Sequence, residues 1–252
     1  MADATDPVIR LVDVHKRFGD LVVLDGVSLD IPRGQTVAII GPSGAGKSVL
    51  IKHIVGLLEP DSGEVWVDGI DMAHATERQK RGVRKRFGML FQGGALFDSL
   101  TAGENVAFPL RYHTKLSESE RRRVAEEKLA MVDLPGIYDR PTPQLSGGQR
   151  KRVGLARAIV LEPEVVVFDE PNSGLDPLTS DTIDDLIVRM KERLGITFVV
   201  ITHDIVQAVR IADWIGMLWE GHLVEYAPRE RFLHTRKQVV RAFMKRNVTL
   251  PQ

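Results

Sequence analysis

Cysteine is absent from this sequence, its net charge is zero, and long apolar runs are missing. Without cysteine the chain forms no disulfide and no thiolate metal site, which suits a reducing compartment. Basic and acidic residues each total 34, so there is none of the basic excess that nucleic-acid-binding proteins usually carry, and we expect no nucleic-acid partner. No run approaches the roughly 18 apolar residues that a membrane-spanning helix needs. If the protein works at a membrane, we expect another chain to cross it.

The clearest motif that is present is a glycine-rich loop at residues 41–48, Gly-Pro-Ser-Gly-Ala-Gly-Lys-Ser. A short apolar strand is predicted before it at 36–40, and a helix after it from Lys47 to about Leu58. Glycines let the backbone wrap phosphate groups with its N–H donors turned inward, and a helix N-terminus favours anions. Lys47 supplies a positive charge for the β- and γ-phosphates, and the Ser48 hydroxyl is a ligand for Mg²⁺. The predicted nucleotide-binding residues are Gly41, Pro42, Ser43, Gly44, Ala45, Gly46, Lys47, Ser48 and Val49.

An acidic pair, Asp169 and Glu170, follows the apolar run Val165–Phe168. Adjacent acids are commonly solvated surface, but a carboxylate at the end of a buried strand reaches a metal ion through water. We therefore predict Asp169 as a metal-binding residue and Glu170 as the base for an attacking water. General-base assistance of this kind contributes about 10²–10⁴ in rate.

The order of predicted strands and helices indicates an α/β fold with a mostly parallel sheet. Apolar, β-branched runs at 165–168 and 196–201 are typical of strands covered on both faces, and an amphipathic helix is predicted between them. Further extended segments are predicted at 8–14, 21–31 and 64–67. The chain thus alternates strand and helix over most of its length.

Residues 93–160 differ from this alternation and are predicted to be helical. Ser117-Glu-Ser-Glu120 has the spacing of a capping box and predicts a helix to about Val132. The arginines at 121–123 form a solvated helix face or, alternatively, contact lipid headgroups. Within one overall domain we predict a nucleotide-binding core of residues 1–92 and 161–252, a helical subdomain of residues 93–160, and a helical tail at about 225–252, either packed on the protein or lying on a membrane surface.

A second motif, Leu145-Ser-Gly-Gly-Gln149, lies about a hundred residues after the glycine-rich loop. Kinases, GTPases and helicases share the loop, but the two motifs in this order, followed by the acidic pair, resemble the ABC transporter ATPases. The resemblance covers about residues 8 to 230. It implies a P-loop NTPase (RecA-like) core with antiparallel β elements and a helical insertion, the ABC ATPase fold. It also implies that the protein binds ATP and Mg²⁺ and hydrolyses ATP to power transport.

The same resemblance assigns roles to single residues. Phe18, in Lys-Arg-Phe-Gly, matches the aromatic that stacks on adenine, usually tyrosine; taken alone it would equally be a core residue. Gln92 matches the glutamine that contacts Mg²⁺ and water, and His203 the histidine that contacts the γ-phosphate. Asp176 matches a loop that crosses a dimer interface, with Gly174 where alanine is common. The predicted catalytic residues are Glu170, His203 and Gln92, and the predicted metal-binding residues are Ser48, Gln92 and Asp169.

The signature residues also imply a partner. Ser146, Gly147, Gly148 and Gln149 begin a predicted helix that ends near Val160. In the family the signature of one subunit covers the γ-phosphate held by the other. The resemblance therefore implies a head-to-tail dimer of two copies with two ATP sites. Hydrolysis removes the bridging contacts and the dimer opens, a population shift that drives a membrane partner.

Residues 84–112 are similar to the ATPases of Mce-type lipid transport systems, including the Mla system that moves phospholipids between bacterial membranes. The phrases Phe-Gln-Gly-Gly-Ala-Leu-Phe-Asp-Ser-Leu and Glu-Asn-Val-Ala-Phe-Pro-Leu-Arg carry this likeness. It implies an MCE-domain lipid-binding partner and a transmembrane permease, with the protein peripheral on the cytoplasmic face of the inner (plasma) membrane. The permease is expected in a groove around Gly93–Tyr112, with contacts from Ala95, Leu96, Phe97 and Phe108.

Two alternatives to lipid transport stay open. One is the ATPase of another transporter, for a small solute or lipopolysaccharide; Asn172 stands where threonine is commoner in the family. The other is a non-transport ABC ATPase that acts as a switch in repair or translation. Such switches usually have tandem ATPase domains or long coiled-coil insertions, and neither is present in this sequence.

Overall fold

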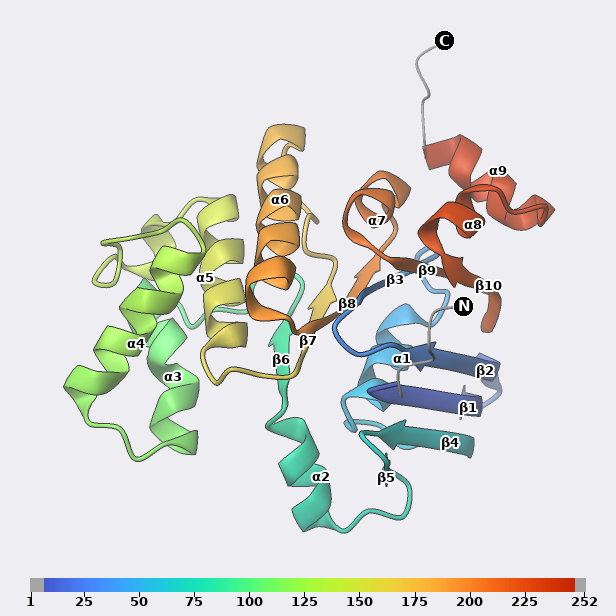
Figure 1. Cartoon of the computed structure of the whole chain (residues 1–252), viewed down its shortest axis with the longest axis horizontal. Helices are drawn as coiled ribbons and strands as arrows, with labels where there is room; N and C mark the ends of the chain where they lie inside the picture. Colours follow the sequence, from blue (N-terminus) through green and yellow to red (C-terminus); the bar gives the residue numbers. More distant parts are fainter. Residues whose placement is uncertain (1–6, 248–252) are drawn as a thin grey trace. The chain divides into compact units, whose positions relative to one another are not determined.

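A computed structural model of the chain describes residues 7–247, which divide into two compact units (Figure 1). Unit 1 comprises residues 7–84 and 194–247, and unit 2 comprises residues 85–193. Across the described residues, none of the helices combines the length and the apolar character that crossing a bilayer requires.

One sheet of unit 1 is antiparallel, with strand order β2–β1–β4–β5. Ile9, Leu11 and Val14 of β1 are buried while residues between them face solvent, the alternation of a sheet covered on one face. The extended segments predicted at 8–14, 21–31 and 64–67 are confirmed. The strands are β1 (Ile9–Phe18), β2 (Leu21–Ile31), β4 (Ser62–Val67) and β5 (Ile70–Asp71).

The other strands of unit 1 surround β3, whose five residues are all buried. β8 and β9 run parallel to β3 on its two sides, and β10 pairs antiparallel with β9. The predicted parallel arrangement is confirmed. The strands are β3 (Thr36–Ile40), β8 (Thr197–Thr202), β9 (Trp214–Trp219) and β10 (His222–Pro228), and the helices are α1 (Lys47–Ile54), α2 (Glu77–Arg84), α7 (Ile205–Ile211), α8 (Arg229–Leu233) and α9 (Gln238–Asn247).

Unit 2 joins a parallel strand pair, β6 and β7, to most of the long helices. The predicted capping box is confirmed: the Ser117 hydroxyl accepts the Glu120 N–H, and the Glu120 carboxylate accepts the Ser117 N–H. The buried stripe of that helix includes Ala125 and Leu129. The elements are β6 (Phe87–Leu90), α3 (Ala102–His113), α4 (Glu118–Met131), η1 (Thr142–Gln144), α5 (Gly147–Ile159), β7 (Val165–Asp169) and α6 (Pro177–Leu194).

Two predicted helices differ from the observed ones. α1 ends at Ile54 rather than near Leu58, because Gly56 turns the chain with φ +67°. The helices of the C-terminal tail begin at Arg229 rather than 225, because residues up to Pro228 pair with β9 and Tyr226 stacks on Trp214 at 5.1 Å. The end of the predicted tail, residues 248–252, lies outside the described residues.

The compact units have different boundaries from the predicted core and subdomain. β6, β7 and α6 belong to the same unit as the helices α3, α4 and α5, so unit 2 is larger than residues 93–160. Parallel pairing of β6 with β7 and packing of α5 on β6 account for this grouping. The functional division into core and signature subdomain stays a prediction.

Candidate functional site

The predicted phosphate loop lies in unit 1, between β3 and α1. Gly41, Gly44 and Gly46 have φ angles of +154°, +81° and +98°, a region that favours glycine. A Cβ on Gly41 would lie 2.2 Å from the carbonyl oxygen of Leu218, and one on Gly46 would lie 2.7 Å from that of Val23. The loop therefore follows a backbone path that side chains at these two positions would block.

Lys47 is the first residue of α1, and its side chain returns over the loop. Its ammonium group donates to the carbonyl oxygens of Gly41 (2.8 Å) and Pro42 (2.9 Å), and the residue is only 7% exposed. In the described part of the chain, no side chain caps the N-terminus of this helix. A helix N-terminus beside an ammonium group favours an anion, so this end of unit 1 suits phosphate groups. Ser48, next on the helix, is exposed.

His53 lies further along α1 and makes stability depend on pH. Its Nδ1 lies 2.7 Å from the Val49 carbonyl oxygen, and burial is the main cause that lowers the pKa of His53 from 6.5. The His53 imidazole therefore binds a proton more readily in the unfolded chain than in the folded chain. As a result, the free energy of unfolding decreases as pH falls from 6.5 through the lower pKa of the folded state. Between about pH 7.5 and about pH 5.5 we expect the melting temperature to fall more for wild type than for His53→Gln. Parallel pH slopes in thermal melts would contradict this.

Phe18 ends β1 and lies on an exposed apolar hairpin. It pairs with Leu21, and the two are 49% and 66% exposed; Val22 is 47% exposed. The neighbouring Val23 lies against Gly46 of the phosphate loop. An exposed ring on the hairpin that contacts this loop suits stacking of a base, whereas the alternative of a core residue does not fit its exposure.

His203 follows β8 and is exposed. The next residue, Asp204, caps α7 by accepting the N–H groups of Val206 (2.8 Å) and Gln207 (3.2 Å). His203 lines a cavity of about 620 Å³, and Pro42 and Ser43 of the phosphate loop line the same cavity. Unit 1 therefore brings the predicted histidine and the predicted phosphate loop together. The cavity is lined by Pro42, Ser43, His203, Trp219, Val239, Ala242 and Phe243.

The acidic pair lies in unit 2, at the end of β7. Asp169 and Glu170 are half-buried, and Glu170 has a left-handed φ of +52°. The carbonyl oxygen of Glu170 accepts the Ser173 N–H at 3.1 Å. Gln92, exposed after β6, donates from its side-chain amide to the Ser173 hydroxyl at 3.4 Å. Unit 2 thus links the predicted Gln92 to the turn that contains Glu170.

The signature residues begin α5, as predicted. The Ser146 hydroxyl accepts the Gln149 N–H at 3.2 Å, and the Gln149 side chain accepts the Ser146 N–H at 3.0 Å. A Cβ on Gly148 would lie 2.6 Å from Thr179, so the signature lies against the start of α6. Asp176 accepts the Thr179 N–H (3.0 Å) and hydroxyl (2.5 Å), and these bonds lower the pKa of Asp176.

The sequence patterns missed two residues that hold the segment after Gln92. The side chain of the buried Asn105 accepts the Phe97 N–H at 2.8 Å and donates to the Phe97 carbonyl oxygen at 3.1 Å. Arg157 of α5 donates to the carbonyl oxygens of Gly94 (2.7 Å) and Ala95 (2.8 Å). The segment that carries the Mce-type likeness is therefore attached to the signature helix. Asn105 belongs to a sequence phrase that carries this likeness, but nothing in the phrase indicates that its amide bonds the backbone of Phe97.

The donors present fit Mg²⁺. Within residues 7–247 no group of three or more His, Cys, Asp or Glu side chains is placed to hold a metal ion. Mg²⁺ at a nucleotide needs only one or two protein ligands, because phosphate and water oxygens fill the other positions. The Ser48 hydroxyl of unit 1 and the Asp169 carboxylate of unit 2 are hard oxygen donors of the kind this ion prefers.

A glycine-rich loop of this conformation, leading from a parallel strand into a helix, is the phosphate-binding structure of P-loop nucleotide hydrolases. Comparison with known proteins identifies the family to which the chain belongs within this class. The ABC transporter family matches residues 24–173, and the chain belongs to that family. It is an ATP-binding subunit and an ATPase that uses Mg²⁺.

Three of its relatives are informative. A probable ribonucleotide transport ATP-binding protein of Mycobacterium leprae is 42% identical over 236 residues, which are 94% of this chain and 68% of that protein. The intermembrane phospholipid transport system ATP-binding protein MlaF of Haemophilus influenzae is 40% identical over 238 residues, 94% of this chain and 90% of MlaF. A dimeric ATP-binding cassette, MJ0796, bound to ADP and Pi has a TM-score of 0.79 and 35% identity, over 88% of this chain and 98% of that one.

Proposed function

We propose that this protein powers phospholipid transport of the Mce/Mla kind as a peripheral subunit on the cytoplasmic face of the inner membrane. One observation carries the proposal: within residues 84–112, the segment that carries the likeness to that group, Phe97, Phe108 and Tyr112 form a partly exposed aromatic surface. MlaF, 90% of which aligns with this chain, supports the same assignment. The mycobacterial relative, whose name gives ribonucleotides as the cargo, is longer than this chain, which spans about two thirds of it.

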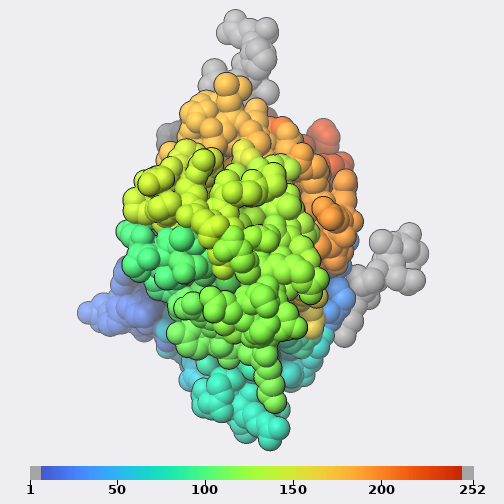
Figure 2. All heavy atoms as spheres, turned by 90° about the vertical axis from the view of Figure 1, so that its left-hand side faces the viewer, coloured from blue at the N-terminus to red at the C-terminus, as the bar shows by residue number. Residues whose placement is uncertain are grey.

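The aromatic surface consists of Phe97, Phe108 and Tyr112. Ring centroids are 4.6 Å apart for Phe97 and Phe108 and 5.0 Å apart for Phe108 and Tyr112, so the three rings form a row. Phe97 is 43% and Tyr112 71% exposed, and atoms of α3 and α4 form much of the face seen in Figure 2. An exposed row of aromatic rings is typical of a protein–protein contact. We assign this surface, with Ala95 and Leu96, to the cytoplasmic helix of a permease.

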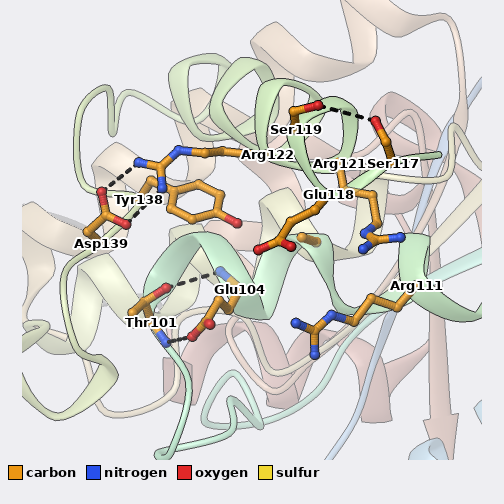
Figure 3. A pocket seen from close by; sticks show the side chains of 11 residues that line it. Thr101, Glu104, Arg111, Ser117, Glu118, Ser119, Arg121, Arg122, Tyr138 and Asp139 are labelled. Atoms are coloured by element: carbon orange, nitrogen blue, oxygen red, sulfur yellow. Dashed lines mark hydrogen bonds and ion pairs between the residues drawn. The ribbon is translucent and has the colours of Figure 1, made fainter.

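A polar cavity of about 620 Å³ lies between α3, which carries Phe108 and Tyr112, and α4 (Figure 3). Arg122 and Asp139 form a two-pronged ion pair at its rim (3.0 and 2.6 Å), and the guanidinium lies 4.1 Å from the Tyr138 ring centre. Arg111 and Glu118 also line the cavity. These charges suit polar flanks of the same permease helix and favour a protein contact over the alternative of lipid headgroups at the arginine run.

For ATP hydrolysis we propose that the predicted site residues of unit 1 and those of unit 2 act on the same nucleotide. The core (residues 1–92 and 161–252) and the signature subdomain (residues 93–160) are the proposed functional parts. Phe18 stacks on adenine, and Gly41–Val49 hold the phosphates. Ser48, Asp169 and Gln92 would hold Mg²⁺, which would supply positive charge to the phosphate groups. Glu170 accepts a proton from water as the water oxygen bonds to the γ-phosphorus and the bond to the leaving oxygen of ADP breaks. His203 donates a hydrogen bond to the γ-phosphate.

We further propose that two copies associate head-to-tail, with Ser146–Gln149 and Asp176 of each copy facing the ATP of the other. The exposed hydroxyl of Ser146 and the N-terminus of α5 are the groups that favour an anion there. The dimeric cassette MJ0796 supports the association of two copies. An MCE-domain lipid-binding protein is the third proposed component.

The test is a mild-detergent pull-down of the tagged protein from native membranes, with mass spectrometry of proteins and lipids. We expect a multi-span permease, an MCE-domain protein and phospholipid. Tyr112→Asp should lose the permease, because it places a charge in the aromatic row. Leu57→Asp is the matched control, since Leu57 is 59% exposed in unit 1, outside that row. A different permease would reassign the cargo, and recovery of no membrane protein by wild type would favour the switch alternative.

A further inference from the structure

Lys151 is a buried charge that the proposed chemistry does not use. It lies on α5, two residues after the signature, and is only 3% exposed. Its ammonium group donates to the backbone carbonyl oxygen of Glu170 at 3.1 Å. Burial lowers the pKa of Lys151, whereas the charges of Glu170 and Asp169 act in the opposite direction. A buried ammonium group is costly unless it is paired, so this contact calls for an explanation beyond packing.

The contact lies at a constrained point of the chain. Glu170 is not glycine, yet its φ of +52° lies in the left-handed region, which few non-glycine residues adopt. Its carbonyl oxygen accepts two hydrogen bonds, from the Ser173 N–H at 3.1 Å and from Lys151. Both bonds fix the orientation of the peptide that follows Glu170 and therefore restrict the directions open to its carboxylate.

We propose that Lys151 is a positioning residue, which holds the proposed base Glu170 in its left-handed conformation and joins it rigidly to the signature helix. The inference deepens the proposed function and rests on Glu170 as the base. It assigns Lys151 no contact with ATP. Loss of the ammonium group therefore lowers the rate of the chemical step and leaves nucleotide binding unchanged.

The first experiment compares wild type with Lys151→Met, which keeps a long apolar side chain but loses the charge. We expect kcat for ATP hydrolysis to fall about tenfold to a hundredfold, the usual effect of one charged hydrogen bond, with KM for ATP unchanged. Lys128→Met is the matched control, because Lys128 of the same unit is 8% exposed and bonds Glu162 at 3.1 Å. A merely structural lysine would lower the melting temperature and leave kcat per folded molecule unchanged.

A second experiment repeats the substitution in the Glu170→Gln protein. If Lys151 acts through Glu170, Lys151→Met should not lower the residual rate of that variant further. An equal fractional loss in both backgrounds, or a wild-type kcat for Lys151→Met, would overturn the inference. If Lys151→Met does not fold, Lys151→Gln replaces it with the same expectation of a lowered kcat. A wild-type rate for Glu170→Gln alone would instead remove the base from the proposed function, so the two failures are distinguishable.

Discussion

Glu170→Gln protein should bind ATP as wild type does and hydrolyse it at least about a hundredfold more slowly, because an amide does not accept the proton of the attacking water. The replacement has almost the same size, and the bonds from Ser173 and Lys151 go to the backbone carbonyl oxygen, which it keeps. Calorimetry of ATP binding and steady-state phosphate release measure the two halves of this expectation. Trapped ATP should also hold the proposed dimer closed, which gel filtration with ATP and Mg²⁺ detects.

The same strand offers a matched control. Glu164 directly precedes β7 as Glu170 directly follows it, and its carboxylate pairs with Arg86 at 2.7 Å. Glu164→Gln removes an exposed ion pair, a change that usually costs at most about 1 kcal/mol of stability. It should hydrolyse ATP at the wild-type rate. Unimpaired hydrolysis by Glu170→Gln would remove Glu170 from the role of base.

Motifs defined by backbone conformation were predictable from the sequence. The glycines at 41, 44 and 46 predicted a phosphate loop, and all three have positive φ angles. Ser117 and Ser146 lie at helix starts because side-chain capping is a local interaction of three or four residues. Short-range chemistry of this kind depends little on the rest of the fold.

Contacts between distant segments were not predictable in the same way. The pairing of residues near 225 with β9 depends on a partner strand, so a local pattern read there as helix was misleading. Lys151 offered a weak signal, since it falls on the buried stripe of α5 with Gly148 and Leu155. A lysine on such a stripe needs an acceptor, but which one becomes known only when β7 and its turn are in place. The grouping of β6 with β7 in one unit, too, depends on a pairing of strands that composition does not reveal.

Lys47→Ala should weaken ATP binding itself, in contrast to Glu170→Gln. The ammonium group of Lys47 is nearly buried and bonds two carbonyl oxygens of its own loop, so its position at the cradle is fixed before a nucleotide arrives. Losing one charged hydrogen bond of about 1.5–3 kcal/mol lowers affinity by roughly tenfold to a hundredfold. Lys47→Arg should not restore it, because a planar guanidinium does not reproduce the compact charge of an ammonium group. Calorimetry with ATP and Mg²⁺ measures the change.

Lys52→Ala is the control for that experiment, because Lys52 is exposed on the same helix and outside the phosphate loop. Equal melting temperatures for the two alanine variants would show that α1 is intact in both. Weak binding by Lys47→Ala alone would then be a property of the cradle. Normal ATP binding by Lys47→Ala would mean that the glycine loop and helix N-terminus hold the phosphates without it, and the assignment of Lys47 would be wrong. If ATP binding is lost in Lys47→Ala and only hydrolysis is lost in Glu170→Gln, as we propose, the two variants together separate the two functions of the site.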